Sequence, residues 1–283
     1  MKGRTIAVTT LVLIAALAIP LAAWETEGHN FITSHAIGLL PEPLKSAFTK
    51  NRAYLLSHDL DPDRWKLSMP LESPHHYIDL DNLDKPPFNE IPRDYDEAAI
   101  KFGKDKLDRN GTVPWVIERH YKLLVTAFRG LARRPSDQPL FEAAILAHYV
   151  EDAHVPFHGN ANYDGQLTEQ KGIHSRFEGE IVRRFIALQS LGKLPLEPKY
   201  EIVHVAAFNW SIESFGLTEA LLKADLEAKA KAGDYNDKYF EEFKKVAVPI
   251  AKQRLEQGAQ RLASLWAQAY EEAGKPDLGK LGY

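Results

Sequence analysis

The chain has 283 residues, of which 45% are hydrophobic, so it is long and apolar enough for a full core and is not a disordered or low-complexity protein. It contains no cysteine, which excludes disulfide bonds and leaves core packing or bound metal to brace an exported fold. The formal charge of −4 provides no overall positive field for polyanions, which weighs against a protein that grips long nucleic acid.

The first 23 residues resemble a secretory signal peptide. Lys2 and Arg4 precede an almost wholly apolar run over 6–19, and a small-residue cleavage site ends at Ala23. The alternative is an uncleaved membrane anchor, but the run is shorter than the roughly 20 residues that span a bilayer. We therefore expect an exported protein, periplasmic or extracellular, with a mature domain of residues 24–283. That domain has 33 basic and 39 acidic residues, a charge of −6.

Helical periodicity dominates the rest of the chain, and prolines stand where helices would begin or end. The pattern predicts an all-α fold, a single multi-helical domain, with a C-terminal scaffold of long helices rich in Ala, Lys and Glu. The expected helices are 29–39, 42–56, 94–104, 114–133, 138–152, 175–191, 201–230 and 236–273. The segment 57–93 carries six prolines and is expected to be an ordered loop, of a kind that is often functional.

The strongest local signal is a run of histidines and carboxylates at the end of one expected helix. His148 and Asp152 are four residues apart, so they share one face of the helix. Pro156 ends the helix, which allows His158 to fold back towards the same point. This run places nitrogen and oxygen donors close together.

A second pair, His174 and Glu178, repeats the spacing of four. Zinc takes such N and O donors, although pairs of this kind are also found on ordinary helix surfaces. Residues 144–147 are apolar, so His148 is expected to face inward. Adjacent buried imidazoles and carboxylates need partners, and a metal ion satisfies several of them together. The two pairs therefore favour a metal site.

The new N-terminus and the proline-rich loop offer further donors. Cleavage after Ala23 would make Trp24 the first residue, and its free amine, with a pKa near ~8, would readily give up a proton to a metal. The amine and the Trp24 carbonyl can close a chelate ring, with His29 completing the set. The loop adds three aspartates and two histidines, a weak signal by itself: Asp59, Asp61, Asp63, His75 and His76.

Together these residues resemble the trinuclear-zinc superfamily that contains bacterial zinc-dependent phospholipase C and the single-strand-specific nucleases. The similarity runs from Trp24 to about Glu178. Its most specific parts are the block His148-x3-Asp152-x5-His158 and a tryptophan at the cleavage site with a histidine five residues on.

The resemblance implies three zinc ions per chain. One would be held by Asp63, His76, His148 and Asp152; another by the Trp24 amine and carbonyl, His29 and the shared Asp152; the third by His158, His174 and Glu178. Asp63 would also act in catalysis by orienting the attacking hydroxide. Asp61 is the reserve for Asp63, whereas His76 is preferred to His75 because His76-Tyr77-Ile78-Asp79 is similar to a run in the family.

The resemblance also implies a phosphoric diester hydrolase, but its members divide between two substrates. The segment 172–178 and the lack of cysteine favour a phospholipase C-like enzyme acting on a phospholipid head group. The spacing of Trp24 to His29 favours a single-strand-specific nuclease or 3′-nucleotidase, in which Tyr77 and Asp79 would bind a base. A catalytically inactive zinc-binding helical protein is the third hypothesis. No stable protein partner is implied. His154, between two ligands, is expected to support them or to face substrate.

Overall fold

The computed structural model describes residues 24–130, 138–186, 191–192 and 194–280, so the expected signal peptide lies outside the described residues. Within these ranges the regular elements are helices and no strand occurs, which confirms the all-α prediction. No helix in the described ranges combines the length and the apolar character needed to cross a lipid bilayer.

The longer helices are α1 (Glu25–Leu39), α8 (Val113–Phe128), α9 (Pro139–Asp152), α12 (Val203–Phe215), α13 (Thr218–Ala232) and α14 (Asp237–Glu272). The shorter ones are α2 (Leu44–Lys50), α3 (Arg52–His58), α4 (Asp61–Trp65), α5 (Leu80–Leu83), α6 (Tyr95–Phe102), α7 (Lys104–Arg109), α10 (Ile173–Ser175) and α11 (Val182–Phe185). Single turns of other helix types are η1 (Ser73–His76), η3 (Pro156–Gly159), η4 (Arg176–Ile181) and η6 (Leu278–Lys280).

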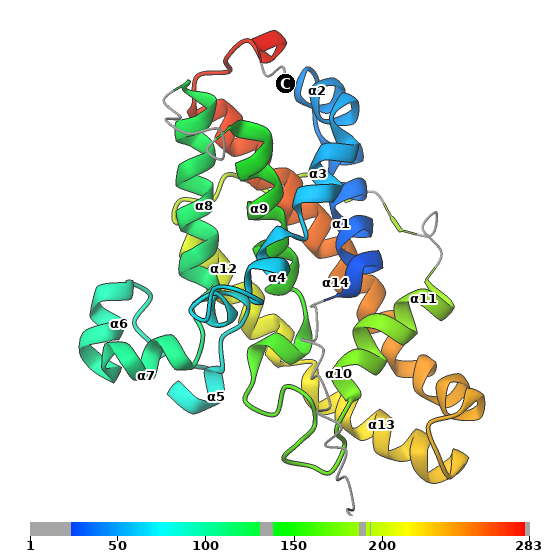
Figure 1. Ribbon diagram of the computed structural model, residues 1–283. Helices are drawn as coiled ribbons and strands as arrows, with labels where there is room; N and C mark the ends of the chain where they lie inside the picture. The colour runs from blue at the N-terminus through cyan, green and yellow to red at the C-terminus, as the bar shows by residue number, and fades with distance from the viewer. Residues whose placement is uncertain (1–23, 131–137, 187–190, 193, 281–283) are drawn as a thin grey trace, which may run out of the picture.

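Helix α9 is the centre of the bundle. It packs against α8, α3 and α14, and Figure 1 shows α14 running diagonally behind α9 and α1. A helix that is apolar on all sides is normally buried, and here 13 of the 14 residues of α9 are buried. Pro139 stands in its first turn, where a missing N–H costs nothing. Because Pro156 follows closely, the chain turns at Asp152 into η3, and this turn positions the candidate site.

The expected helix over 201–230 is wrong, because the structure divides it into α12 and α13. The turn between them is bound to the segment that follows α9. The Ser214 hydroxyl donates to the Ala153 carbonyl oxygen at 2.7 Å, and the Thr218 hydroxyl donates to that of Pro156 at 3.1 Å. These contacts join distant segments, so helical periodicity within 201–230 does not reveal them.

Two other expected helices are also divided. The helix over 42–56 breaks at Asn51, and the one over 94–104 breaks at Gly103, whose φ of 82° is in the region that favours glycine. The segment 57–93 is ordered, as predicted, but it contains three short helical elements, α4, η1 and α5.

Candidate metal centre

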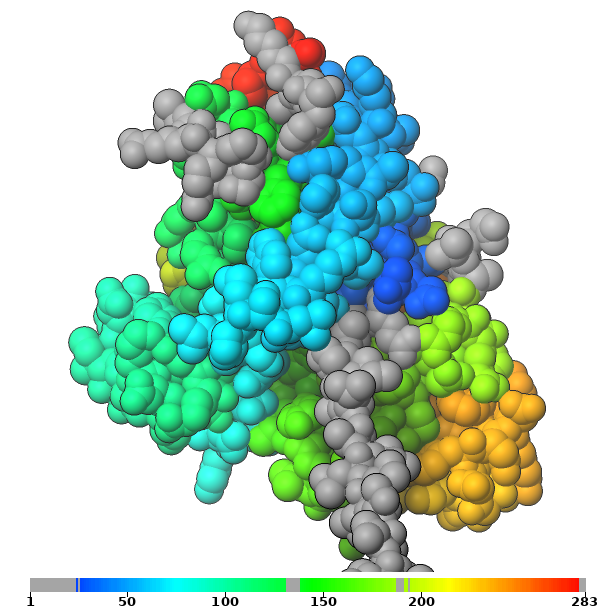
Figure 2. All heavy atoms as spheres, in the orientation of Figure 1, coloured from blue at the N-terminus to red at the C-terminus, as the bar shows by residue number. Residues whose placement is uncertain are grey.

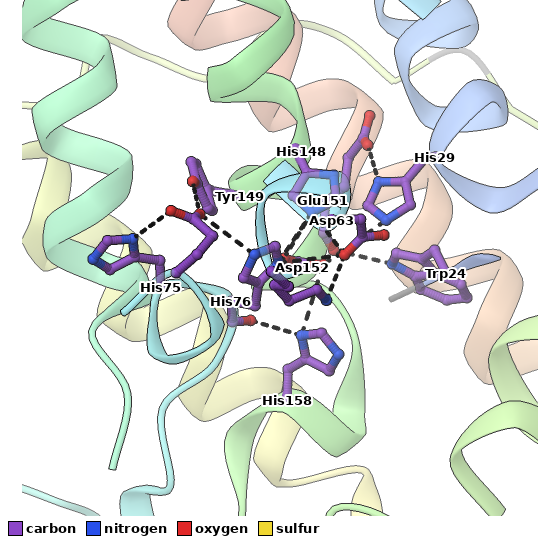
Figure 3. Close-up of polar contacts among 12 residues, drawn as sticks. Trp24, His29, Asp63, His75, His76, His148, Tyr149, Glu151, Asp152 and His158 are labelled. Atoms are coloured by element: carbon purple, nitrogen blue, oxygen red, sulfur yellow. Dashed lines mark hydrogen bonds and ion pairs between the residues drawn. The ribbon is translucent and has the colours of Figure 1, made fainter. Parts of the chain in front are cut away.

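Nine predicted ligand residues come together beside the C-terminal end of α9. Figure 3 shows several of them around Asp152. The donor atoms of eight fall into three groups, in each of which they lie within 4.8 Å of one another. The contributors are Trp24 just before α1, His29 in α1, Asp63 in α4, His76 in η1, His148 and Asp152 in α9, His158 in η3, His174 in α10 and Glu178 in η4.

The first group consists of Asp63, His76 and His148. Asp63 Oδ1 lies 3.7 Å from His76 Nδ1 and 3.6 Å from His148 Nε2. Asp152 Oδ2 approaches the same two rings, at 2.8 Å from His76 Nδ1 and 3.4 Å from His148 Nε2. Two carboxylates and two imidazoles therefore surround one point.

The second group consists of His29, His148 and Asp152. The other oxygen of Asp152, Oδ1, lies 3.9 Å from His29 Nε2 and 3.7 Å from His158 Nδ1. The His29 and His148 rings stack, with centroids 4.4 Å apart. Since the two oxygens of Asp152 face different histidines, this carboxylate is placed to serve two cations.

The third group consists of His158, His174 and Glu178. His174 Nε2 lies 2.9 Å from Glu178 Oε2. Burial lowers the pKa of His158 to about 3, so this ring is neutral at pH 7. His158 Nδ1 donates to the His76 carbonyl oxygen at 2.7 Å, which leaves Nε2 with a lone pair for a ligand.

Trp24 is fully buried, and its backbone N–H donates to Glu178 Oε2 at 3.0 Å. The resemblance groups Trp24 with His29 and Asp152, whereas this hydrogen bond joins it to the third group. Gly28 makes room for the indole, because a Cβ at this position would lie 2.8 Å from Trp24 Cβ. The first residue of the expected mature chain is thus packed into the centre.

Many buried atoms of the centre have no hydrogen bond within the protein, although Asp63 Oδ1 is paired with Lys66 and His174 Nε2 with Glu178. Among the described residues, nine of the 14 buried side-chain N or O atoms without a hydrogen bond belong to the predicted ligands. They are His29 Nε2, both oxygens of Asp63, His76 Nε2, His148 Nδ1, Asp152 Oδ1, both nitrogens of His174 and Glu178 Oε1. Each such atom costs about 1–3 kcal/mol if nothing binds it. Neutral imidazole and carboxylate are the donors that zinc prefers, so these residues fit zinc.

The pKa values of the two aspartates at the centre are lowered. Burial acts to raise the pKa of Asp152, but the surrounding histidines, with His148 foremost, outweigh it and hold the pKa well below its usual range. Burial likewise acts to raise the pKa of Asp63, and His148 and Lys66 reverse the direction. Lys66 Nζ lies 2.5 Å from Asp63 Oδ1. Both aspartates are therefore in the form that binds a cation.

Of the loop aspartates, Asp63 belongs to a candidate metal group and Asp61 does not. Asp61 has partners of its own, at 2.7 Å from His58 Nδ1 and 2.7 Å from Arg64 Nη1. His75 also lies apart from the groups and contacts Glu72 at 3.2 Å. This geometry favours Asp63 and agrees with the preference for the second histidine of the pair.

His154 does not lie against the predicted ligands. It is fully buried, with Nδ1 2.7 Å from the Val150 carbonyl oxygen and Nε2 3.1 Å from Arg261 Nη1. It joins α9 to α14, so the expectation that it supports the ligands or faces substrate is not met by these contacts. The position of His154 between two predicted ligands in the sequence did not predict its contacts, because the chain turns at Pro156 before it reaches His158.

A fourth buried group consists of Asp59, Glu151 and the ring of His29. Asp59 is one of the loop donors expected from the sequence, whereas Glu151 and its contact with His29 were not predicted. Burial, together with the repulsion between the two carboxyl groups, raises the pKa of Asp59 well above its usual value. Burial raises that of Glu151 as well. The only available signal was a glutamate within an apolar helix, next to a predicted ligand.

A cavity of about 310 Å³ opens onto the centre. It is lined by Lys66, Ser73, His76, Tyr77, Asp79, Phe157, His158, Tyr163 and His174. Both predicted substrate-binding residues, Tyr77 and Asp79, are in this wall. Burial and the neighbouring Asp81 raise the pKa of Asp79 to about 7. Substrate can thus approach three candidate ligands through an aromatic pocket.

No known protein family's sequence model matches the chain, and a search of curated proteins finds no match to it.

Proposed function

We propose that the chain is an exported zinc-dependent phosphoric diester hydrolase of the phospholipase C type, with the trinuclear centre and fold that its motifs resemble. The observation that carries the proposal is the cluster of largely buried imidazole and carboxylate groups around Asp152, many of whose donor atoms have no hydrogen bond, beside a cavity that reaches three of the candidate ligands. In such a centre zinc supplies a nucleophile at neutral pH and offsets charge on phosphorus.

The residues of the cavity have distinct tasks in this proposal. Asp63 is ionised, and its Oδ2 atom has no hydrogen bond while Oδ1 pairs with Lys66, so Oδ2 can accept a hydrogen bond from the attacking nucleophile and orient it. Lys66, beside Asp63, lines the cavity and can pair with a phosphate oxygen. His158 and His174 lie in the same wall, so the third group faces the leaving side of a bound phosphodiester.

The surroundings of the cavity favour a lipid over a polyanion. Leu67, Met69 and Leu71, which are 73%, 49% and 83% exposed, lie on the segment between two cavity residues, Lys66 and Ser73. Figure 2 shows the surrounding segment, in cyan, at the surface facing the viewer. Grouped exposed apolar side chains mark sites that meet apolar partners. We infer that this segment meets the acyl region while the head group enters the cavity.

A second segment at the cavity, the loop that carries Tyr163, also exposes large hydrophobic side chains. Tyr163 lines the cavity and is 49% exposed, and Leu167 on the same loop is 70% exposed. Tyr77, Tyr163 and Phe157 could instead stack a base, and this observation keeps a single-strand-specific nuclease as the second candidate.

The test measures metal content and hydrolysis on the mature protein. We expect about three zinc ions per chain, turnover of a chromogenic phosphocholine ester and of phosphatidylcholine vesicles, and loss of both after chelation. Turnover of single-stranded DNA alone would replace the lipase by the nuclease. One zinc or none, or full metal without any turnover, would reject the proposed enzyme.

A double variant tests the lipid-facing segment. Leu67→Asn with Leu71→Asn should lower hydrolysis of vesicles at least about tenfold, because two leucines no longer enter the apolar phase. Hydrolysis of the soluble ester should stay unchanged. Ile100→Asn is the matched control, because Ile100 is 85% exposed and lies on α6. Equal losses on both substrates would contradict a role at the lipid surface.

A further inference from the structure

Behind His29, on the side away from Asp152, lies the fully buried carboxyl pair of Asp59 and Glu151. His29 Nδ1 lies 2.5 Å from Glu151 Oε2. The Thr33 hydroxyl is 2.8 Å from Glu151 Oε1 and 3.4 Å from Asp59 Oδ2. Burial raises the pKa of both carboxyl groups, and the repulsion between them adds to the rise at Asp59. The pair joins α9 to α1 and to the end of α3.

This pair is costly if it has only a packing role. Among the residues that the structure describes, no lysine or arginine forms an ion pair with Asp59 or Glu151, and His29 is the one basic partner. Apolar residues of similar volume often replace a buried charged group without loss of stability. This cost indicates that the pair has a functional role at His29.

Glu151 determines how the ring of His29 is presented. With its proton on Nδ1, His29 donates a hydrogen bond to Glu151 Oε2, and Nε2 then carries the lone pair. That Nε2 atom lies 3.9 Å from Asp152 Oδ1 and has no hydrogen-bond partner. The contact with Glu151 thus orients the ring so that Nε2 can bind a cation next to Asp152.

Glu151 also holds the second N-terminal element of the centre. Its backbone carbonyl oxygen accepts a hydrogen bond from the Trp24 indole at 3.0 Å. One residue therefore fixes His29 through its side chain and Trp24 through its backbone, and it directly precedes Asp152 in α9 (Figure 3). Trp24, His29 and Asp152, the three members of the proposed second zinc site, are therefore all linked directly to Glu151.

We propose that Glu151, supported by Asp59, is a positioning residue that aligns His29 for the zinc ion shared with Asp152. This inference rests on the proposed metal centre. In this proposal Glu151 orients His29 and does not bind a fourth metal together with it. The separation of His29 Nδ1 and Glu151 Oε2 is 2.5 Å, which is that of a short hydrogen bond.

The same helix offers a matched control. Glu142 is also buried in α9, and its Oε2 atom lies 2.9 Å from His120 Nδ1. His120 belongs to none of the candidate metal groups of the described residues. Glu142→Gln therefore makes the same chemical change to a buried Glu–His pair without touching the centre.

The experiment measures zinc stoichiometry by native mass spectrometry, chelator competition, and the absorption spectrum of the cobalt-substituted protein. Glu151→Leu should weaken one of the three metals by roughly 10- to 100-fold and change one component of the cobalt spectrum. Glu151→Gln should recover much of the affinity, because its amide oxygen can accept the hydrogen bond from Nδ1. Asp59→Asn should have a smaller effect of the same kind, and Glu142→Gln should have none.

Retention of all metals and an unchanged cobalt spectrum in Glu151→Leu would overturn the inference. If that variant does not fold, unchanged affinity in both Glu151→Gln and Asp59→Asn, or an equal loss in Glu142→Gln, would overturn it too. Four metals in the starting protein, with one lost in Asp59→Asn, would make the pair a ligand set instead. A starting protein that binds no zinc would reject the metal centre itself, and with it this inference.

Discussion

Two buried polar regions meet at the C-terminal end of α9, and they differ in how their polar atoms are satisfied. The first is the candidate metal centre around Asp152. The second, which we call the arginine network, consists of the buried residues His154, Arg254 and Arg261 and their exposed partner Glu213, between α9, α12 and α14. Arg254 is fully buried, yet all three of its guanidinium nitrogens donate hydrogen bonds.

His148 and His154 show the contrast within a few residues. Both are fully buried. Each nitrogen of His154 has a protein partner, whereas His148 Nδ1 has none and Nε2 faces other candidate ligands. This fold can therefore satisfy buried polar atoms with its own groups where they serve only packing. The scarcity of such partners around Asp152 supports the proposal that a cation binds there.

The largest expected effect is that of Asp152→Asn. The amide is a poor cation ligand and carries no charge, so both sites that share Asp152 lose their bridge. We expect hydrolysis to fall by roughly 10³-fold or more, together with loss of more than one zinc. Metal analysis and rates measured on one sample check this, with Glu142→Gln as control. Full metal content at the normal rate would remove the distinction between the two regions.

The next effect concerns the N-terminus. One extra residue before Trp24 turns the proposed chelating amine into an amide, so we expect one zinc to bind more weakly and the rate to fall about 10²-fold or more. Circular dichroism and thermal melting should show the helices intact. The same extension after Tyr283 is the control. A fully active protein with the N-terminal extension would show that the buried Trp24 has only a packing role.

Much of the centre follows from the sequence because helical spacing decides which side chains share a face. His148 and Asp152 lie within α9, His174 and Glu178 lie on the consecutive turns α10 and η4, and the turn at Pro156 is local. The apolar residues 144–147 also predict correctly that His148 is buried. These features depend on neighbouring residues only.

The remaining features depend on contacts between distant segments. The sequence shows Glu151 within an apolar helix, but it does not show that the approach of α1 and α3 places this residue beside His29. The arginine network could not be predicted either, because Arg254 and Arg261 resemble surface residues of a long charged helix and only contacts with distant segments bury them. The break after α12 likewise arises from hydrogen bonds to the segment beyond α9.

The smallest of these effects is expected in the arginine network. Arg254→Met removes the donors to the carbonyl oxygens of His154 and Trp210 and to Glu213, while methionine fills part of the volume. We expect the free energy of unfolding to fall by about 3 kcal/mol, because buried acceptors lose their partners. Zinc content and the rate on a soluble ester should stay within about twofold, because these bonds hold α9, α12 and α14 together and contact none of the predicted ligands. Urea unfolding and metal analysis of the same preparation separate the two quantities. Loss of zinc from a folded Arg254→Met protein would show that the two regions are coupled through η3, and the division between a self-satisfied network and a cation-dependent centre would then fail.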